Sequence, residues 1–282
     1  MKGILILTYL LTLIQQGIAC SCVYPTEISK AFVASKTVVY GEIVELKIIK
    51  VSDSMDPDSL RHYLQKEELN DLQSEILNSD FLIQAKLRII ELFKGEINNE
   101  TLTLYTTRTG ASCGFTGFEI GKQFIIYSSP NSYFFSHFYQ PQGNRRLEKA
   151  NTNWVTSCSI TTALREDHLN MLQVIKIARE GLNILKTKDL LKNENKIYST
   201  VLVKNYEGKF DHILFENDEI ITNNELKRQD LILTLLSIQG NIAELSFKSF
   251  DDGGFVHNGT IKLVKNKREW AKDSMNYLSA IE

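Results

Sequence analysis

The sequence lacks an excess of charge of either sign. Its 32 Lys and Arg residues are offset by 34 Asp and Glu residues, and no basic stripe is present, so nucleic acid is not expected as a partner. Compositional bias is also absent, because 43% of the residues are apolar and 23% are charged, which excludes disordered, collagen-like and coiled-coil chains. A length of 282 residues is sufficient for two globular domains.

Motifs that carry catalysis are lacking as well. The sequence has no HExxH or comparable zinc-binding spacing, no GxSxG motif, no phosphate-binding loop and no dinucleotide-binding glycine pattern. The five histidines are scattered along the chain: His62, His137, His168, His212 and His257. We therefore do not expect an enzyme, and we expect no cofactor and no metal bound by this chain alone.

Residues 1–19 have the three parts of a secretory signal peptide. Lys2 precedes an apolar run at 3–14, and the small residues Gly17 and Ala19 stand just before Cys20. The run is about twelve residues long, which is too short to cross a bilayer, and no second run of this kind follows. The sequence therefore predicts an exported chain without a transmembrane segment, cleaved after Ala19.

Cleavage after Ala19 makes Cys20 the N-terminal residue, and two outcomes remain open. In one, the Cys20 thiol carries a lipid anchor, as in bacterial lipoproteins, and the protein stays in the periplasm or at the cell surface. Gly17 stands where such signals usually carry Leu. In the other, Cys20 keeps a free α-amine and forms a disulfide, and the protein is secreted.

Four cysteines, Cys20, Cys22, Cys113 and Cys158, predict two disulfide bonds in an exported protein. Three pairings are formally possible. A bond between Cys20 and Cys22 is the poorest, because a ring across one intervening residue distorts disulfide geometry. Each N-terminal cysteine is therefore expected to bond to a distant one, which fixes the N-terminus to the body of its domain.

Several segments around these cysteines follow one another in the order of a known family. They are CSCVYP at 20–25, AFVASKTVVYGEIVEL at 31–46, IIELFKGE at 89–96, SCGFTGFEIGKQFIIYS at 112–128 and TSCSIT at 156–161. In this order they resemble the tissue inhibitors of metalloproteinases and related netrin modules. The resemblance covers residues 20–165 and is closer to the short bacterial relatives than to the animal inhibitors.

The resemblance implies both a fold and an inhibitory mechanism. It implies an OB-fold, a five-stranded Greek-key barrel, with disulfides Cys20–Cys113 and Cys22–Cys158. In the family, the α-amine and carbonyl oxygen of the first cysteine chelate the catalytic zinc of a metalloprotease, and both groups belong here to Cys20. The residues implied in cleft contact are Cys20, Ser21, Cys22, Val23, Tyr24, Ala111, Ser112 and Cys113.

A second function stays open beside inhibition of a zinc metalloendopeptidase. The chain can instead be a non-inhibitory binding or adhesion module on the same scaffold, anchored through a lipid on Cys20. The state of the Cys20 α-amine separates the two functions, because acylation removes the lone pair that chelates zinc. Two departures from the animal inhibitors are a third disulfide that is missing here and the bulky Tyr24 before the proline.

Hydrophobic periodicity predicts a mostly β first domain at 20–165. Apolar residues alternate with polar ones at 81–89, and strand-like runs at 38–51, 102–104 and 124–127 accompany a short helix at 27–36. Gly41 lies inside the first run, where glycine often marks a bulge or a sharp bend.

A polar insert at 52–80 separates the first two predicted strands. Four apolar residues recur in it at helical spacing: Leu60, Leu64, Leu72 and Ile76. We expect a solvated helical excursion with one packed edge. In the related inhibitors this connection can touch the protease, so the insert is where specificity would be added.

Residues 166–282 are expected to form a second, α+β domain of unassigned role. Its helix presents one apolar face made of Leu169, Leu172, Ile175, Ala178, Leu182 and Leu185. Strand-like runs follow at 198–203, 212–215, 230–238, 242–250 and 260–264. A helix followed by a meander that ends near Trp270 is distantly similar to NTF2-like domains.

Overall fold

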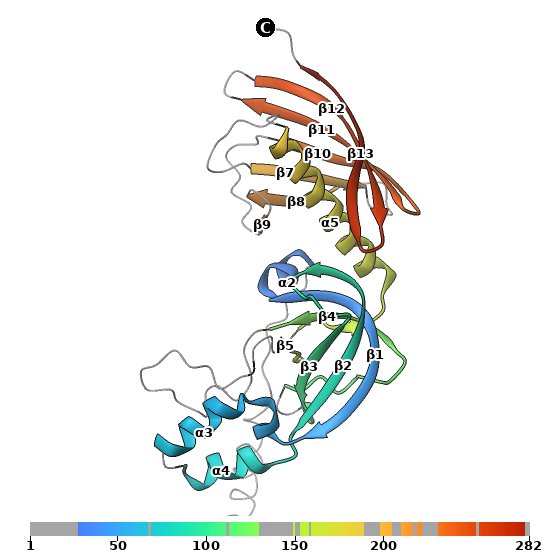
Figure 1. Ribbon diagram of the computed structural model, residues 1–282. Helices are drawn as coiled ribbons and strands as arrows, with labels where there is room; N and C mark the ends of the chain where they lie inside the picture. Colours follow the sequence, from blue (N-terminus) through green and yellow to red (C-terminus); the bar gives the residue numbers. More distant parts are fainter. Residues whose placement is uncertain are drawn as a thin grey trace, which may run out of the picture. The chain divides into compact units, whose positions relative to one another are not determined.

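The computed structural model describes residues 28–66, 69–110, 113–129, 149, 153–157, 159–188, 198–204, 210–216, 219–221, 231–251 and 254–279. They form a mixed α/β protein with one six-stranded and one seven-stranded sheet (Figure 1). The chain divides into two compact units. The first holds residues 35–90 and 94–163, and the second holds 27–34, 91–93 and 164–282, so the main break along the chain follows Ala163.

The first unit is built on a sheet with the strand order β5-β3-β2-β1-β4-β6. The strands are β1 Thr37–Ile49, β2 Leu82–Lys94, β3 Thr101–Thr107, β4 Gln123–Ser128, β5 Asn153–Trp154 and β6 Thr162–Ala163. β1 pairs antiparallel with β4, and β2 pairs antiparallel with β3, whereas β3 and β5 are parallel. The four strands predicted from periodicity are all present.

Alternation along β2 explains how this sheet builds its core. Ala85, Leu87 and Ile89 are buried, while Lys86 and Arg88 between them are exposed. On β1, a Cβ at Gly41 would lie 2.4 Å from the carbonyl oxygen of Arg88. Glycine is therefore needed there because the backbones approach closely, which is one of the reasons a strand carries glycine.

The resemblance implies a five-stranded Greek-key barrel, whereas the regular ladders of the described residues form a six-stranded sheet and no closed barrel. β6 adds a sixth strand beside β4, and β5 is only two residues long. Among the described residues, the edges at β4 and β5 are linked by one antiparallel bridge between Ser129 and Trp154, with N–O distances of 2.8 and 2.9 Å. Because so short a strand offers few backbone groups, the seam beside it stays open.

The insert at 52–80 is helical, as predicted. It contains a 3-10 turn, η2 Val51–Ser54, and the helices α3 Pro57–Lys66 and α4 Asp71–Asn78. Asn70 begins α4 with a capping box, because its side chain accepts from the Gln73 amide at 2.9 Å and its amide donates to Gln73 Oε1 at 3.1 Å.

The packed edge of the insert differs in part from the prediction. Leu60 and Ile76 pack against a cluster that includes Leu77, but Leu64 and Leu72 are 45% and 59% exposed. The buried cluster consists of Val51, Met55, Leu77, Leu82, Tyr105 and Trp154, with Tyr63 and Leu69 beside it. α3 and α4 are two separate short helices that do not continue one helical phase, so a single spacing rule failed across them.

The second unit combines a long helix, α5 Glu166–Thr187, with a sheet of order β13-β12-β11-β10-β7-β8-β9. The strands are β7 Tyr198–Lys204, β8 Phe210–Glu216, β9 Glu219–Ile221, β10 Leu231–Gln239, β11 Ile242–Asp251, β12 Gly254–Asn266 and β13 Glu269–Ser279. β10 to β13 form a four-stranded antiparallel meander, and β10 joins β7 in parallel. This unit also includes the helix α2 Ile28–Ala34, within the predicted 27–36.

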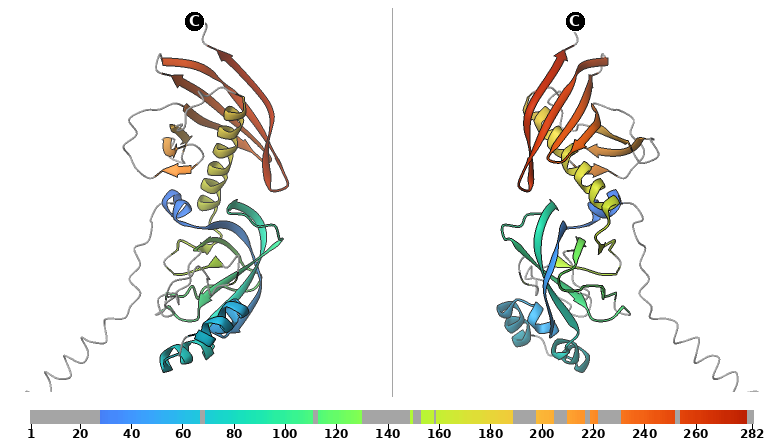
Figure 2. Two further views of the ribbon diagram at one scale, coloured as in Figure 1. Left: turned by 60° about the vertical axis from the view of Figure 1, so that its left-hand side comes forward. Right: turned by 90° about the vertical axis from the view of Figure 1, so that its right-hand side faces the viewer.

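α5 lies against one face of this sheet in both views of Figure 2. Its predicted apolar face is buried except for Leu169, which is half-buried. Further helix residues are buried as well: Val174, Ile177, Gly181 and Ile184. The sheet meets them with Leu231, Leu233, Ala243, Leu245, Phe247, Ile261, Leu263 and Trp270, all buried. The helix therefore buries a broader face than a single stripe.

Candidate functional site

Most residues of the predicted zinc-chelating site lie outside the described residues. These are Cys20, Ser21, Cys22, Val23, Tyr24, Ala111 and Ser112, together with the predicted disulfide partner Cys158. Cys113 is described, and it is disulfide-bonded. Its bonding partner is one of the cysteines outside the described residues, so the predicted pairing remains a prediction.

Cys113 lies in a tight turn that follows β3, and we call the described residues of this turn, 109–110 and 113–115, the Cys113 loop. Its backbone has φ 59°, in the left-handed region that a residue with a Cβ seldom adopts. Two hydrogen bonds close the turn: the Cys113 amide donates to the Gly110 carbonyl at 3.1 Å, and the Gly114 amide donates to the Thr109 carbonyl at 3.0 Å. The loop is therefore fixed by its own backbone before any disulfide is considered.

The end of β3 supports the Cys113 loop from the other side. Thr106, which is buried, accepts a hydrogen bond on Oγ1 from the Phe115 amide at 2.7 Å. A Cβ at Gly114 would lie 2.0 Å from the Thr107 carbonyl oxygen, so only glycine fits there. Phe115 also packs on Phe118 and Phe124, with ring centroids 4.7 and 6.0 Å away.

A second cysteine-bearing segment runs beside this loop. Gly114 forms an antiparallel bridge with Thr156, and the Ser157 amide donates to the Cys113 carbonyl at 2.8 Å. Ser157 immediately precedes Cys158 in the sequence. The backbone therefore brings the neighbourhoods of Cys113 and Cys158 together, and periodicity alone could not have revealed this bridge.

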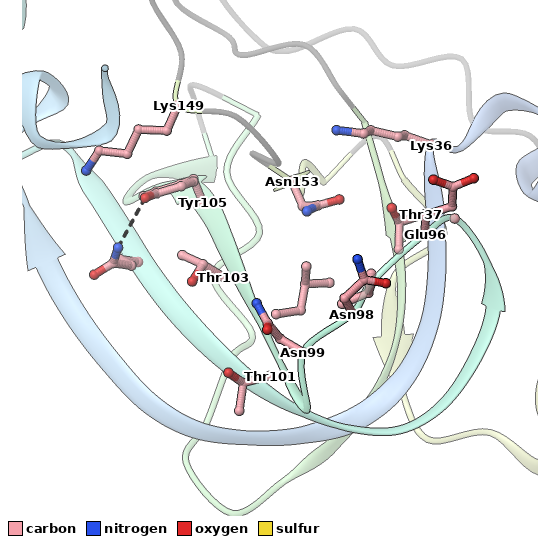
Figure 3. Close-up of a pocket in the computed structure, with 14 residues that line it drawn as sticks. Lys36, Thr37, Glu96, Asn98, Asn99, Thr101, Thr103, Tyr105, Lys149 and Asn153 are labelled. Atoms are coloured by element: carbon pink, nitrogen blue, oxygen red, sulfur yellow. Dashed lines mark hydrogen bonds between the residues drawn. The ribbon is translucent and has the colours of Figure 1, made fainter. Parts of the chain in front are cut away.

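A cavity of about 870 Å³ opens elsewhere in the first unit (Figure 3). Its lining residues come from the start of β1, from β2, from the β2–β3 connection, from β3 and from the region of β5. They are Lys36, Thr37, Gln84, Gly95, Glu96, Ile97, Asn98, Asn99, Thr101, Leu102, Thr103, Tyr105, Lys149 and Asn153. Sequence reasoning missed this site because the lining residues are scattered over separate segments and carry no ligand-binding motif.

Buried side chains form the floor of the cavity. Thr37, Leu102, Tyr105 and Asn153 are each at most 5% exposed. Tyr105 Oη accepts a hydrogen bond from Gln84 Nε2 at 3.2 Å, drawn as the dashed line in Figure 3. Burial raises the pKa of Tyr105, so its hydroxyl stays protonated and keeps a hydrogen to donate.

Most polar side chains that line the cavity are neutral hydrogen-bonding groups, beside Lys36, Glu96 and Lys149. Within the described residues no group of His, Cys, Asp and Glu side chains is arranged to hold a metal ion. The Lys149 ammonium donates to the backbone carbonyl of Asp53 at 2.5 Å.

Among the helices that the structure describes, none is long and apolar enough to cross a membrane.

Comparison with known proteins shows no family for this chain. No family model matches it, and no curated protein matches it. An NTF2-like protein of unknown function from Shewanella baltica is similar over 42% of this chain and 95% of its own, with 14% identity and a TM-score of 0.19. Another NTF2-like protein of unknown function, from Silicibacter pomeroyi, is similar over 41% of this chain and 98% of its own, with 15% identity and a TM-score of 0.19.

Proposed function

We propose that the chain is an exported inhibitor of zinc metalloendopeptidases, in which residues 20–165 form a domain like that of the tissue inhibitors of metalloproteinases. In this proposal a signal peptide at 1–19 is removed, and the protein is secreted with Cys20 at its N-terminus. The chain itself catalyses no reaction. The Cys20 α-amine and carbonyl oxygen bind the zinc of the target protease.

The observation that carries this proposal is the hydrogen bond between Ser157 and Cys113. Cys20 and Cys22 are two residues apart, so their Cα atoms lie within about 7 Å of each other, and their disulfide partners must be close together too. The Ser157 amide lies 2.8 Å from the Cys113 carbonyl, which supports Cys113 and Cys158 as those two partners. The bonded state of Cys113 agrees with this pairing.

The strand order supports an OB-type barrel beneath that site. β1, β2, β3, β5 and β4 are neighbours in this order, and the Ser129–Trp154 bridge links the last two. With β3 and β5 parallel and with β1–β4 and β2–β3 antiparallel, this order suits the partly open Greek-key barrel of that fold. The extra strand β6 lies outside this ring.

Zinc chemistry explains why an N-terminal cysteine can inhibit. A catalytic zinc keeps one open position for water or substrate and accepts a fifth ligand. An α-amine with a pKa of about 7.7 to 8.0 loses its proton readily to a competing metal. Two disulfides that hold this terminus rigid remove an ordering cost of about 1 to 2 kcal/mol per backbone residue from binding.

Non-reducing mass spectrometry of the exported protein is the first test. We expect a free α-amine on Cys20 and disulfide-linked peptides that join Cys20 to Cys113 and Cys22 to Cys158. The same protein, titrated into a panel of zinc metalloendopeptidases, is expected to inhibit at a one-to-one ratio. A diacylglyceryl thioether on Cys20, or the absence of inhibition across the panel, rejects the proposal and favours an anchored binding module.

A matched variant separates chelation from general binding. One alanine added before Cys20 displaces the α-amine but leaves both predicted disulfides possible. We expect this extended protein to keep the disulfide map of the parent and to lose inhibition at least a hundredfold. Retained inhibition by the extended protein would show that Cys20 does not chelate the zinc.

A further inference from the structure

The cavity of the first unit differs in composition from an ordinary small-molecule site. Sites of 300 to 1,000 Å³ are usually lined mainly by apolar and aromatic side chains. This cavity has a comparable volume of about 870 Å³, but eight of its side chains are neutral amides or hydroxyls. They are Thr37, Gln84, Asn98, Asn99, Thr101, Thr103, Tyr105 and Asn153. Its ligand must therefore be rich in neutral hydrogen-bonding groups.

The polar side chains on the rim are available to such a ligand. Asn98, Asn99 and Thr103 are exposed, and Thr101 is partly exposed. The side chains of these four residues make no hydrogen bond within the part of the chain that the structure describes. Figure 3 shows the Asn98 and Asn99 amides on the same side of the cavity, across from Tyr105.

The floor beneath this rim is rigid. The ring of Tyr105 packs against that of Trp154 with centroids 5.4 Å apart and planes tilted by 34°, and Gln84 Nε2 donates to the Tyr105 hydroxyl oxygen. Ser128 Oγ donates to Asn153 Oδ1 at 3.0 Å, which orients the buried Asn153 amide. A site whose polar groups are already oriented avoids the entropy cost of ordering them on binding.

Charge argues against an anionic or a metal ligand. The cavity holds two lysines and one glutamate, with no arginine and no histidine in its lining. The Lys149 ammonium is already bonded to the Asp53 carbonyl, and Lys36 belongs to the opposite side of the cavity in Figure 3. The side-chain amide of Asn or Gln carries an NH2 donor next to a carbonyl acceptor. A hydroxyl group of a ligand both donates and accepts, so it can bond to both parts of such an amide.

We propose that this cavity binds a short neutral oligosaccharide, with the amides of Asn98 and Asn99 and the hydroxyl of Thr103 receiving the sugar hydroxyls. Binding here uses no residue of the Cys113 loop and no N-terminal residue. The proposal therefore stands or falls independently of zinc chelation.

Calorimetric titration with three neutral trisaccharides tests the proposal. Cellotriose, maltotriose and tri-N-acetylchitotriose are each added to the disulfide-bonded protein up to millimolar concentration. Asn99-Glu100-Thr101 is also an N-glycosylation sequon, so the protein is produced in a bacterial periplasm, where Asn99 stays unmodified. We expect saturable binding of at least one trisaccharide. Absence of binding by all three overturns the proposal, and so does binding of an unrelated extended peptide with equal affinity.

Variants on the rim locate the binding to the cavity. Asn99→Ala combined with Asn98→Ala removes two hydrogen-bonding amides and is expected to weaken binding by about tenfold or more. Thr103→Trp fills the cavity from an exposed strand position and is expected to abolish binding without loss of folding. Asn170→Ala, at an exposed position on α5, is the matched control and is expected to bind like the parent. Unchanged binding by both rim variants would reject this location.

Discussion

Lys265 Nζ lies 2.7 Å from Glu91 Oε2, and the carboxylate of Glu91 is almost completely buried. Gln173 donates to the same oxygen at 2.6 Å, and Lys176 lies 3.3 Å from Oε1. The indole Nε1 of Trp270 in turn donates a hydrogen bond to Gln173 Oε1 at 3.4 Å. One buried carboxylate therefore forms ion pairs with two ammonium groups. The side chains that carry them are largely buried too, with 18% of Lys176 and 21% of Lys265 exposed.

Replacing Glu91 is expected to destabilise the second unit more than replacing either lysine. Glu91→Gln removes the carboxylate that both buried ammonium groups contact, and breaking a buried pair in this way costs about 3 to 5 kcal/mol. Lys265→Met is expected to cost less, because Glu91 keeps Lys176 and Gln173. Glu244→Gln, on the exposed side of β11, serves as a control and is expected to change little.

The two tryptophans allow this comparison to be made for the second unit alone. Trp154 belongs to the first unit and Trp270 to the second, so fluorescence in a Trp154→Phe background follows Trp270 during urea unfolding. Equal losses for Glu91→Gln and Lys265→Met would show that the network does not depend on its shared anion.

Glu180 is expected to make stability depend on pH. Burial, followed by the charge of Glu269, raises the pKa of Glu180. The folded state therefore holds this proton more tightly, which favours folding below pH 4.5 and is lost as the pH rises through the folded pKa. Glu180→Gln removes this loss, so the variant gains stability over the parent as the pH increases.

The gain is expected to be a few tenths of a kcal/mol, because Glu180 is only partly buried and solvent screens its charge. Urea midpoints of both proteins, compared at about pH 4 and about pH 7, measure it. Equal differences between the two proteins at both pH values would contradict the assigned cause.

The elements of both units were largely predictable, because buried strands and helices carry local periodicities. β2 and α5 illustrate this, since their buried positions follow the apolar ones in the sequence. β13 was missed because its described residues show no alternation: apart from the buried Trp270 and the half-buried Met275, they are exposed. Glu91 was missed for a different reason: a charged residue is normally read as exposed, and its partners Gln173, Lys176 and Lys265 are far away in the sequence.

The candidate sites were less predictable than the elements. Cys113 was identified because cysteines in an exported chain are informative by type, whereas its supports Thr106 and Gly114 are common residues that act only through position. The cavity is lined by residues from separate parts of the chain, from Lys36 to Asn153, which pairing of distant strands brings together. No local pattern records such long-range pairing.

Two glycines are expected to respond oppositely to alanine. At Gly114 the new Cβ would meet the backbone carbonyl of Thr107 at 2.0 Å, so the Cys113 loop must move, and we expect a loss of about 3 kcal/mol or more. At Gly181, within α5, the nearest atom is the flexible end of Leu245 at 2.7 Å. A small shift of that side chain is offset by the better helix propensity of alanine, about 1 kcal/mol, so Gly181→Ala is expected to be nearly neutral.

Chemical denaturation of the two alanine variants distinguishes these outcomes. Trp154 fluorescence reports on Gly114→Ala, and Trp270 fluorescence reports on Gly181→Ala. A neutral Gly114→Ala would mean that β3 and the Cys113 loop are not in the close contact that the distances indicate.

Thr106→Val is expected to loosen the Cys113 loop while it preserves the shape of β3. Valine has nearly the size of threonine but offers no acceptor to the Phe115 amide, which is 2.7 Å from Thr106 Oγ1. A buried donor left without its partner costs about 1 to 3 kcal/mol. Thr103→Val is the matched control on the same strand, because Thr103 is exposed and its hydroxyl makes no hydrogen bond in the described part of the chain.

Hydrogen exchange at the Phe115 amide measures this effect directly. In the parent protein that amide is bonded to Thr106, so its exchange requires opening of the loop. In Thr106→Val we expect exchange faster by at least tenfold at Phe115, with unchanged protection at the paired amides of β2 and β3. Equal exchange in both valine variants would show that Thr106 does not hold the loop.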